Sequence, residues 1–107
     1  MPLTKDFKAT VMARAHRDKA FCNAMLTEAI NALLTGDVDV GKAILRDYIN
    51  AAISFEILST ILEKNPKSLM RMLSPKGNPT SNSLFDILHA IQKIKNITAL
   101  ITLIQCA

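Results

Sequence analysis

The stretch of sequence that decides the fold runs from Asn65 to Thr80 and reads NPKSLMRMLSPKGNPT. It predicts a short helix with a sharp start, because Asn65 suits the N-cap position and Pro66 suits the first helical position, which has no N–H to satisfy. The apolar side chains that recur at helical spacing and are expected to face a core are Leu69, Met72 and Leu73. The side chains left on the outer face are Lys67, Met70 and Arg71. A helix of about two turns is not stable alone, so other helices must hold it with this basic face outward.

The rest of the chain supplies those helices. In order, the sequence predicts a helix from Asp6 to Arg17, a helix capped by Asp18 and ended by Gly36, a helix capped by Asp37, a helix over residues 55–62 capped by Ser54, the helix that starts at Pro66, and a last helix that is capped by Thr80 or Ser81 and runs through Ile94.

The helix capped by Asp37 carries apolar side chains at a four-residue spacing. The residues on this ladder, which are expected to face the core, are Val40, Ile44, Tyr48 and Ala52. The polar side chains expected to lie largely outside it are Lys42, Arg46 and Asp47.

A short connector joins the helix over residues 55–62 to the helix that starts at Pro66. It consists of Glu63, Lys64 and Asn65. A connector of three to four residues between two short helices is the geometry of a helix-turn-helix. We therefore expect these two helices to pack together as such a unit, with Leu58 and Leu62 against Leu69 and Met72.

Residues 96–107 form a C-terminal tail of different character. From Asn96 to Ile104 the tail is rich in β-branched residues, and apolar side chains fall on alternate positions. One interpretation is an extended segment, which would need a partner strand from another subunit or another protein because a lone strand has unpaired edges. The other is a helix that continues from residue 94 and packs as core.

Length, charge and cysteine content narrow the class of protein. A chain of 107 residues builds one core, and no apolar run approaches the roughly 20 residues that cross a bilayer. The first residues lack the apolar region of a signal peptide, so an intracellular protein without a membrane partner is expected. Cys22 and Cys106 have no metal-site spacing and are expected to be buried as small hydrophobes.

Positive charge is concentrated around the Pro66 helix. Of the net charge of +4, three units arise from residues 63–77, where the charged residues are Glu63, Lys64, Lys67, Arg71 and Lys76. A locally basic helix favours a polyanion, whose binding gains from the release of counterions. A solvated surface without a ligand is the alternative.

The sequence shows no set of residues that would carry out catalysis. His16 and His89 lie far apart along the chain and beside no recognisable motif. There is no glycine-rich phosphate loop and no metal-binding signature, and Gly77 stands alone between two prolines, as in a tight turn. We expect a protein that is not an enzyme and that has no catalytic residues, metal or cofactor.

The outer face of the Pro66 helix is the candidate DNA-binding site. Lys67 and Arg71 are four residues apart and so project from the same side of a helix, where Arg71 could read guanine by paired hydrogen bonds. Lys64 and Lys76 flank the helix and are better placed for phosphates. Met70 has two interpretations, a contact with a thymine methyl group or a loosely placed surface side chain.

The residues of this region also resemble a known family. The segments that carry the likeness are Leu45–Ala52, Phe55–Ser59, Lys67–Leu73 and Gly77–Thr80. They are similar to the Xre/Cro-type helix-turn-helix antitoxins of the HigA kind, also called addiction-module antidotes. Those proteins often carry a Leu-Ser-x-x-Gly-Asn-Pro-Thr segment after the recognition helix, and residues 73–80 match it at each position. The likeness covers roughly residues 5–94.

The resemblance implies a bacterial or phage-derived regulator that neutralises a RelE-like toxin and represses the operon they share. Carried over by position, the residues of the DNA-reading helix would be Asn65, Lys67, Ser68, Met70 and Arg71. Two residues depart from the family pattern. Ser59 stands where the family usually has alanine, and Glu63 stands where the turn usually has glycine, which suits a left-handed backbone.

Together these observations predict an all-α fold of five to six helices with a lambda-repressor-like helix-turn-helix, in a single domain over residues 1–107. Residues 1–36 would form N-terminal helices, residues 37–95 the DNA-binding core and residues 96–107 the tail. The expected function is that of a cytoplasmic, dimeric repressor and antitoxin whose partners are operator DNA and a RelE/HigB-like toxin. A dimer would place two recognition helices about 34 Å apart on DNA. The alternatives are a protein-interaction module whose DNA binding has decayed, and a stand-alone or phage repressor without a toxin.

Overall fold

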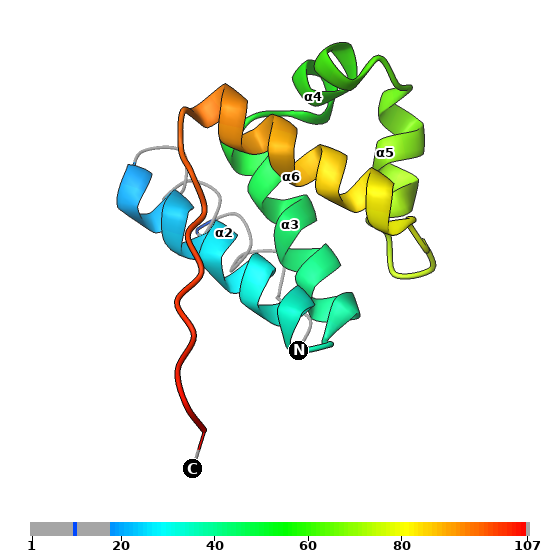
Figure 1. Cartoon of the computed structure of the whole chain (residues 1–107). Coiled ribbons are helices and arrows are strands. Elements are labelled where there is room, and N and C mark those ends of the chain that lie inside the picture. The colour runs from blue at the N-terminus through cyan, green and yellow to red at the C-terminus, as the bar shows by residue number, and fades with distance from the viewer. Residues whose placement is uncertain (1–9, 11–17, 107) are drawn as a thin grey trace.

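The computed structural model describes residue 10 and residues 18–106. Its elements there are the helices α2 (Lys19–Leu34), α3 (Val38–Ala52), α4 (Phe55–Leu62), α5 (Pro66–Met72) and α6 (Ser81–Lys95), as Figure 1 shows. The described part of the chain is therefore all-α, which confirms the predicted fold class. The helix expected from Asp6 to Arg17 lies outside the described residues, apart from residue 10.

Side-chain caps begin most of these helices where the sequence predicts them. Asp18 accepts a hydrogen bond from the Phe21 N–H at 3.2 Å, and Ser54 accepts one from the Ile57 N–H at 3.1 Å. Thr80, rather than Ser81, caps α6. Asp37 occupies the N-cap position of α3, but its side chain makes no capping hydrogen bond. Asp18, Ser54 and Thr80 favour a helix start at their positions, because each accepts a hydrogen bond from an N–H that the helix leaves unpaired.

The core is built by all five described helices. Its fully buried large side chains are Leu45, Tyr48, Ile49, Leu58, Leu69, Leu73, Ile87 and Ile91. α2 and α3 pack side by side, and they lie close together at Gly41, where an added Cβ would lie 2.7 Å from two side-chain carbons of Leu33. α4 contacts both α5 and α6.

The apolar ladder predicted for α3 is correct for Tyr48, which is completely buried, and for Ile44 and Ala52, which pack against the core, but it is wrong at Val40. Val40 is exposed, while Leu45 and Ile49 are completely buried and belong to the core. The reason is geometric: a four-residue step overshoots one helical turn by about 40°, so a strict four-residue ladder drifts off the buried face within three steps. Lys42, expected outside the ladder, is 3% exposed.

The C-terminal tail is extended and not helical. α6 ends at Asn96, whose backbone is left-handed with φ of 53°, and residues 97–106 then run as an extended segment whose first residues lie beside α2 (Figure 1). This observation decides between the two interpretations of the tail. Cys22 is buried as expected, but the prediction for Cys106 is wrong, because the tail leaves that thiol exposed. None of the described helices has the length and apolar character needed to span a bilayer.

Tyr48 is buried completely, and its hydroxyl has no hydrogen-bond partner among the described residues. An unpaired buried hydroxyl costs stability, so the substitution Tyr48→Phe is expected to raise the free energy of unfolding by about 1 kcal/mol at pH 7. Urea denaturation of both proteins measures the change. A clear loss of stability would show that the hydroxyl contributes a favourable interaction.

The same residue makes stability depend on pH. Burial, with a smaller contribution from Cys22, raises the pKa of Tyr48 from 10.0 to about 12. The folded protein therefore keeps this proton between pH 10 and 12, whereas the unfolded chain releases it, and rising pH favours unfolding. Relative to Tyr48→Phe, the native protein is expected to lose about 2 kcal/mol across this window. If the difference in free energy of unfolding between the native protein and Tyr48→Phe were the same at pH 9 and pH 12, this assignment would be wrong.

Candidate nucleic-acid interface

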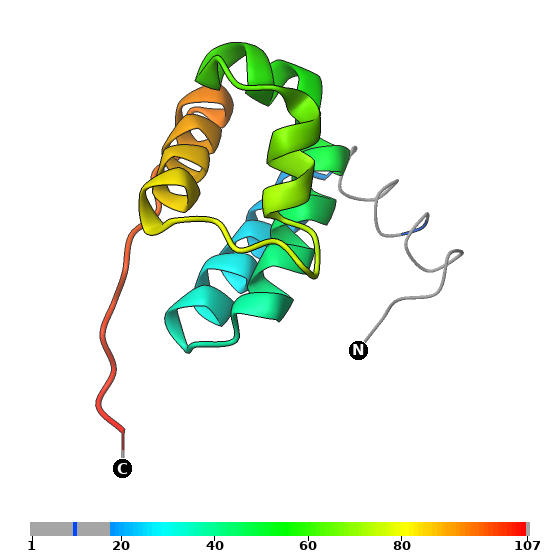
Figure 2. The same ribbon diagram turned by 90° about the vertical axis from the view of Figure 1, so that its right-hand side faces the viewer.

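α4 and α5 form the predicted helix-turn-helix pair, joined by residues 63–65. Leu69 and Leu73 anchor α5 through completely buried side chains. Asn65 caps the helix, since its side-chain oxygen accepts a hydrogen bond from the Lys67 N–H at 2.8 Å. In Figure 2 α5 stands at the face of the molecule turned toward the viewer. The core therefore holds α5 rigidly from one side and leaves its other side accessible.

The turn before α5 has the backbone that the resemblance implies. Glu63 has φ of 54° and ψ of 43°, the left-handed conformation in which a non-glycine residue is uncommon. The N–H groups of Glu63 and Lys64 both donate to the carbonyl oxygen of Ser59, which closes the end of α4. Ser59 itself is buried, and its hydroxyl donates to the Glu56 carbonyl at 2.7 Å. Glutamate and serine thus occupy the two departing positions without disrupting the turn.

Replacing Glu63 by glycine is expected to stabilise the protein by about 1 kcal/mol, because glycine adopts the left-handed conformation without a Cβ clash. The same change removes a negative charge next to the candidate DNA-binding helix, so affinity for DNA should rise. Thermal unfolding and a DNA-binding titration measure the two effects. The variant Glu63→Gln separates them, since it removes the charge and retains the backbone strain. Equal stability of Glu63→Gly and Glu63→Gln would contradict the backbone argument.

The structure gathers the predicted site residues on and beside α5. The exposed members are Lys64, Asn65, Lys67, Met70, Arg71 and Lys76, and Ser68 is half-buried. Met70 is 43% exposed, which leaves it available to a ligand. Within the described part of the chain, no acidic side chain forms an ion pair with any of the four cations in this set. Their charge is thus not neutralised by a neighbouring carboxylate there.

Two basic residues that hold this site in place lie on α3. Lys42 Nζ donates to the carbonyl oxygens of Ser74 at 3.2 Å and Gly77 at 2.5 Å. Arg46 Nη1 donates to the Leu73 carbonyl oxygen at 3.2 Å. These carbonyls lie at the end of α5 and in the loop that follows it, where positive charge also complements the helix dipole. Neither role could be predicted from the sequence, because the partners lie 27 to 35 residues further along the chain.

The loop after α5 folds tightly back on the helix. The Gly77 N–H donates to the Ser74 carbonyl at 2.9 Å, and the Ser74 hydroxyl donates to the Arg71 carbonyl at 2.7 Å. A Cβ at Gly77 would collide with the carbonyl oxygens of Arg71 and Met72. Glycine is therefore required by lack of space, which gives a physical reason for the glycine of the Gly-Asn-Pro-Thr segment.

The histidines and the groups that could bind a metal ion are the other candidate sites in the sequence. His89 is exposed on α6, and His16 lies outside the described residues. Over residues 18–106, no group of three or more His, Cys, Asp or Glu side chains is arranged to hold a metal ion.

Comparisons with protein-family models, curated proteins and solved structures give no significant match.

Proposed function

We propose that the protein is a DNA-binding transcriptional regulator that acts as the antitoxin of a type II toxin–antitoxin module in the cytoplasm. The observation that carries the DNA-binding part is α5: a rigidly anchored short helix whose exposed side bears Lys67, Met70 and Arg71, flanked by Lys64 and Lys76. A helix presented in this way fits the major groove of DNA.

The roles of these side chains follow from their positions. Lys67 and Arg71 project from the same side of α5, and Arg71 would form paired hydrogen bonds with guanine in the groove. Lys64 and Lys76 would contact phosphates at the edges of the helix. The side-chain oxygen of Asn65 is engaged in capping, so only its amide group is free to donate to DNA. Met70 would contact a thymine methyl group.

Binding would be dimeric, because one short helix has too small a contact for selective binding. A dimer presents two copies of α5 to half-sites one helical turn apart or a multiple of it. The expected operator is therefore a palindrome near the gene for this protein.

The antitoxin part of the proposal rests on the resemblance of residues 73–80 to the addiction-module antidotes. The protein would bind a RelE/HigB-like toxin encoded beside it. Co-expression with the neighbouring open reading frame tests this partner: growth rescue together with a stable complex would support the antitoxin role. Growth inhibition that this protein does not relieve would leave a repressor without a toxin, the stand-alone alternative.

Selection from a randomised duplex library tests DNA binding directly. Enrichment of one palindromic sequence is expected, and its affinity should fall steeply as salt rises from about 50 to 200 mM, since each phosphate contact releases counterions. No enrichment, together with binding that does not depend on salt, would refute the proposal.

A second candidate function is a protein-interaction module that retains the fold without binding DNA. The observation in its favour is on α4, where Ile57 and Ile61 are 50% and 51% exposed and lie one turn apart. With Glu63 at the end of the same helix, this surface suits a protein partner better than a phosphate backbone. Tight toxin binding without salt-dependent DNA binding would favour this candidate.

A further inference from the structure

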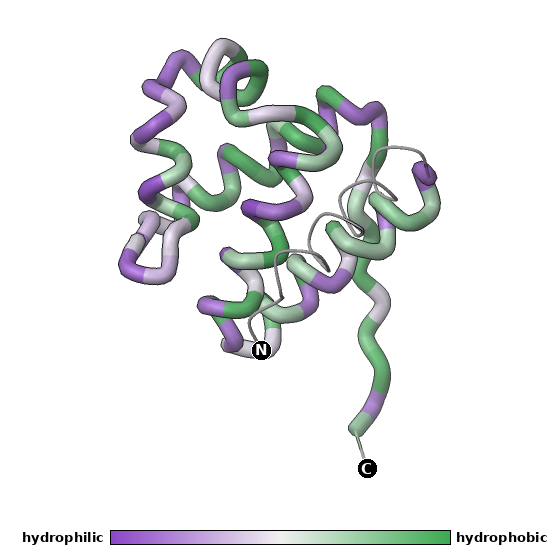
Figure 3. Tube along the Cα trace, turned by 180° about the vertical axis from the view of Figure 1, so that it is seen from behind, coloured by the Kyte–Doolittle hydropathy of each residue, from purple (hydrophilic) through white to green (hydrophobic). Residues whose placement is uncertain are grey.

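The C-terminal tail exposes more apolar surface than any other described segment. Leu100, Leu103 and Ile104 are 85–90% exposed and Ile101 is 65% exposed. Figure 3 shows the tail as hydrophobic along most of its length. Residues 96–107 contain no charged side chain. An apolar segment held outside the core indicates a surface that a partner covers.

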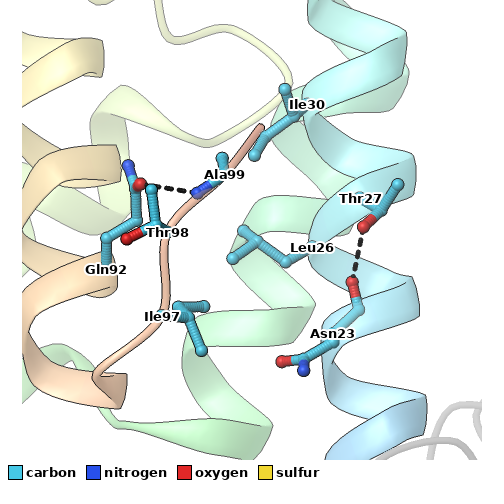
Figure 4. A pocket seen from close by; sticks show the side chains of 8 residues that line it. All are labelled: Asn23, Leu26, Thr27, Ile30, Gln92, Ile97, Thr98 and Ala99. Atoms are coloured by element: carbon cyan, nitrogen blue, oxygen red, sulfur yellow. Dashed lines mark hydrogen bonds between the residues drawn. The ribbon is translucent and has the colours of Figure 1, made fainter. Parts of the chain in front are cut away.

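One edge of the tail is already attached to its own domain. The Ala99 N–H donates to the side-chain oxygen of Gln92 on α6 at 2.9 Å (Figure 4). In an extended chain successive N–H groups point to opposite edges. The N–H groups of even-numbered residues from 98 to 104 therefore point away from Gln92, and no described residue accepts a hydrogen bond from them.

Space exists beside this free edge. A cleft of about 260 Å³ lies between the tail and α2 and is lined by Leu26, Thr27 and Ile30 on the α2 side (Figure 4). Gln92 lies across the tail from these residues. The beginning of the tail thus borders a partly apolar cleft, and its later residues extend free of the helices (Figure 1).

We propose that two copies of this chain pair through their tails as antiparallel strands centred on Thr102. The sequence Leu100-Ile101-Thr102-Leu103-Ile104 repeats its pattern on either side of Thr102. In this register Leu100 lies opposite Ile104, Ile101 opposite Leu103, and Thr102 opposite Thr102, so every pair is matched in polarity. Cross-strand aliphatic and threonine pairs of this kind stabilise a sheet.

The register agrees with the hydrogen bond to Gln92. A two-fold axis at Thr102 makes the even-numbered residues the hydrogen-bonded pairs of the ladder, and their N–H groups point to the edge opposite the Ala99–Gln92 hydrogen bond. A shift by one residue would place isoleucine opposite threonine. After such a shift no residue would lie opposite its own copy, so the two strands could no longer be related by a two-fold axis.

A second copy is the partner that best fits these observations. The described part of each chain contains no strand, so the edge that one copy offers another is the same tail, and a two-fold contact between identical segments is antiparallel. The absence of charge in the tail removes self-repulsion. Four large apolar side chains from each copy would gain cross-strand contacts in addition to the paired main chain.

Tail pairing leaves the candidate DNA-binding helix free, because α5 lies on the opposite side of the domain in both Figure 1 and Figure 2. The inference gives an interface to the dimer of the proposed function. It depends only on the tail, and it is tested by cross-linking and sedimentation without DNA. Its failure can therefore be distinguished from a failure of DNA binding.

A designed disulfide tests the register. Thr98 lies opposite Cys106 of the second copy, and the Cα separation of about 5.5 Å in a hydrogen-bonded pair suits a disulfide. With oxidised glutathione as the oxidant, Thr98→Cys should give a covalent dimer linked from residue 98 to residue 106. Within one extended chain these residues are roughly 26 Å apart, which excludes an internal bridge.

Three controls define the outcome. The unchanged protein should not cross-link, because its exposed Cys106 residues would lie at opposite ends of the paired strands. Thr98→Cys combined with Cys106→Ser should not cross-link, and neither should Thr60→Cys, which places a thiol on exposed α4. Cross-linking of the unchanged protein through Cys106 would indicate parallel pairing and overturn the register. Equal cross-linking of Thr60→Cys would overturn the specific interface.

Sedimentation equilibrium of the full chain tests the energetics. The variant Leu100→Lys/Leu103→Lys should raise the dimer dissociation constant at least about 100-fold, because it introduces four like charges and removes apolar contact. The matched variant Leu34→Lys/Phe85→Lys changes two other exposed apolar residues and should raise it less than about threefold. Circular dichroism checks that both remain helical. A monomeric unchanged protein, or equal effects of the two variants, would overturn the proposal and leave the tail for a strand of another protein.

Discussion

Replacement of Lys67 and Arg71 together by alanine is expected to abolish specific DNA binding without unfolding the protein. The two side chains are exposed on the same side of α5, whereas Leu69 and Leu73 hold the helix from the other side. Loss of one paired contact with guanine costs about 1–3 kcal/mol, and loss of a second cationic contact adds to it. Affinity for the selected duplex should fall about 1,000-fold at physiological salt.

A gel-shift or anisotropy titration measures this loss, and the salt dependence measures its cause. The dependence of affinity on salt should change little, because the phosphate contacts are assigned to Lys64 and Lys76, which this variant retains. The melting temperature should change by no more than about 2 °C, since exposed substitutions alter stability little.

A matched variant separates the position of these charges from their number. Lys19→Ala/Lys93→Ala removes two exposed cations from α2 and α6, away from α5, and should weaken binding far less. Retention of the operator complex by Lys67→Ala/Arg71→Ala at physiological salt would remove α5 as the DNA-reading helix. Equal losses in the two double variants would indicate attraction by total charge alone.

The substitution Lys42→Met is expected to lower the free energy of unfolding by about 3 kcal/mol. Methionine keeps an unbranched apolar stem at this buried position and removes the ammonium group. The Gly77 carbonyl would then lose its partner and the Ser74 carbonyl would keep only the Gly77 N–H, and an unsatisfied buried polar group costs about 1–3 kcal/mol. Because these carbonyls belong to the loop that closes the end of α5, DNA affinity should fall as well. Urea denaturation measures the first effect.

Neighbouring residues provide the controls for Lys42. Asp39 lies 3.6 Å from Lys42 Nζ, but its side chain is 87% exposed, so Asp39→Asn should cost less than about 0.5 kcal/mol. Arg46 donates to one carbonyl and is half-buried, so Arg46→Met should have an intermediate effect. If Lys42→Met were as stable as the unchanged protein, the loop would have to be held by its own turn and by Arg46.

Much of the candidate site could be predicted from the sequence because its determinants are local. Asn65, Pro66 and Thr80 act through atoms within three residues of themselves, so the start of α5 and the end of the loop follow from short-range chemistry. The exposed position of Lys67 and Arg71 follows from helical spacing relative to Leu69 and Leu73. The left-handed backbone at Glu63 was implied by the resemblance, because the family usually has glycine at this position.

The buried face of α3 could not be predicted in the same way. Val40 and Leu45 are both apolar and both lie at helical spacing from other apolar residues, and only the position of α2 decides which of them is covered. The predicted ladder was wrong at Val40 and did not include Leu45 and Ile49, because the edge of the buried face depends on a neighbouring helix.

The sequence by itself determined that this chain is helical, where most of its helices begin and end, and which side of α5 faces outward, because each depends on residues a turn or less apart. Only the tertiary structure decided that Lys42 is buried as the anchor of the loop and that the apolar tail lies outside the core. Both depend on contacts between residues far apart in the chain, and such contacts exist only after the helices have packed.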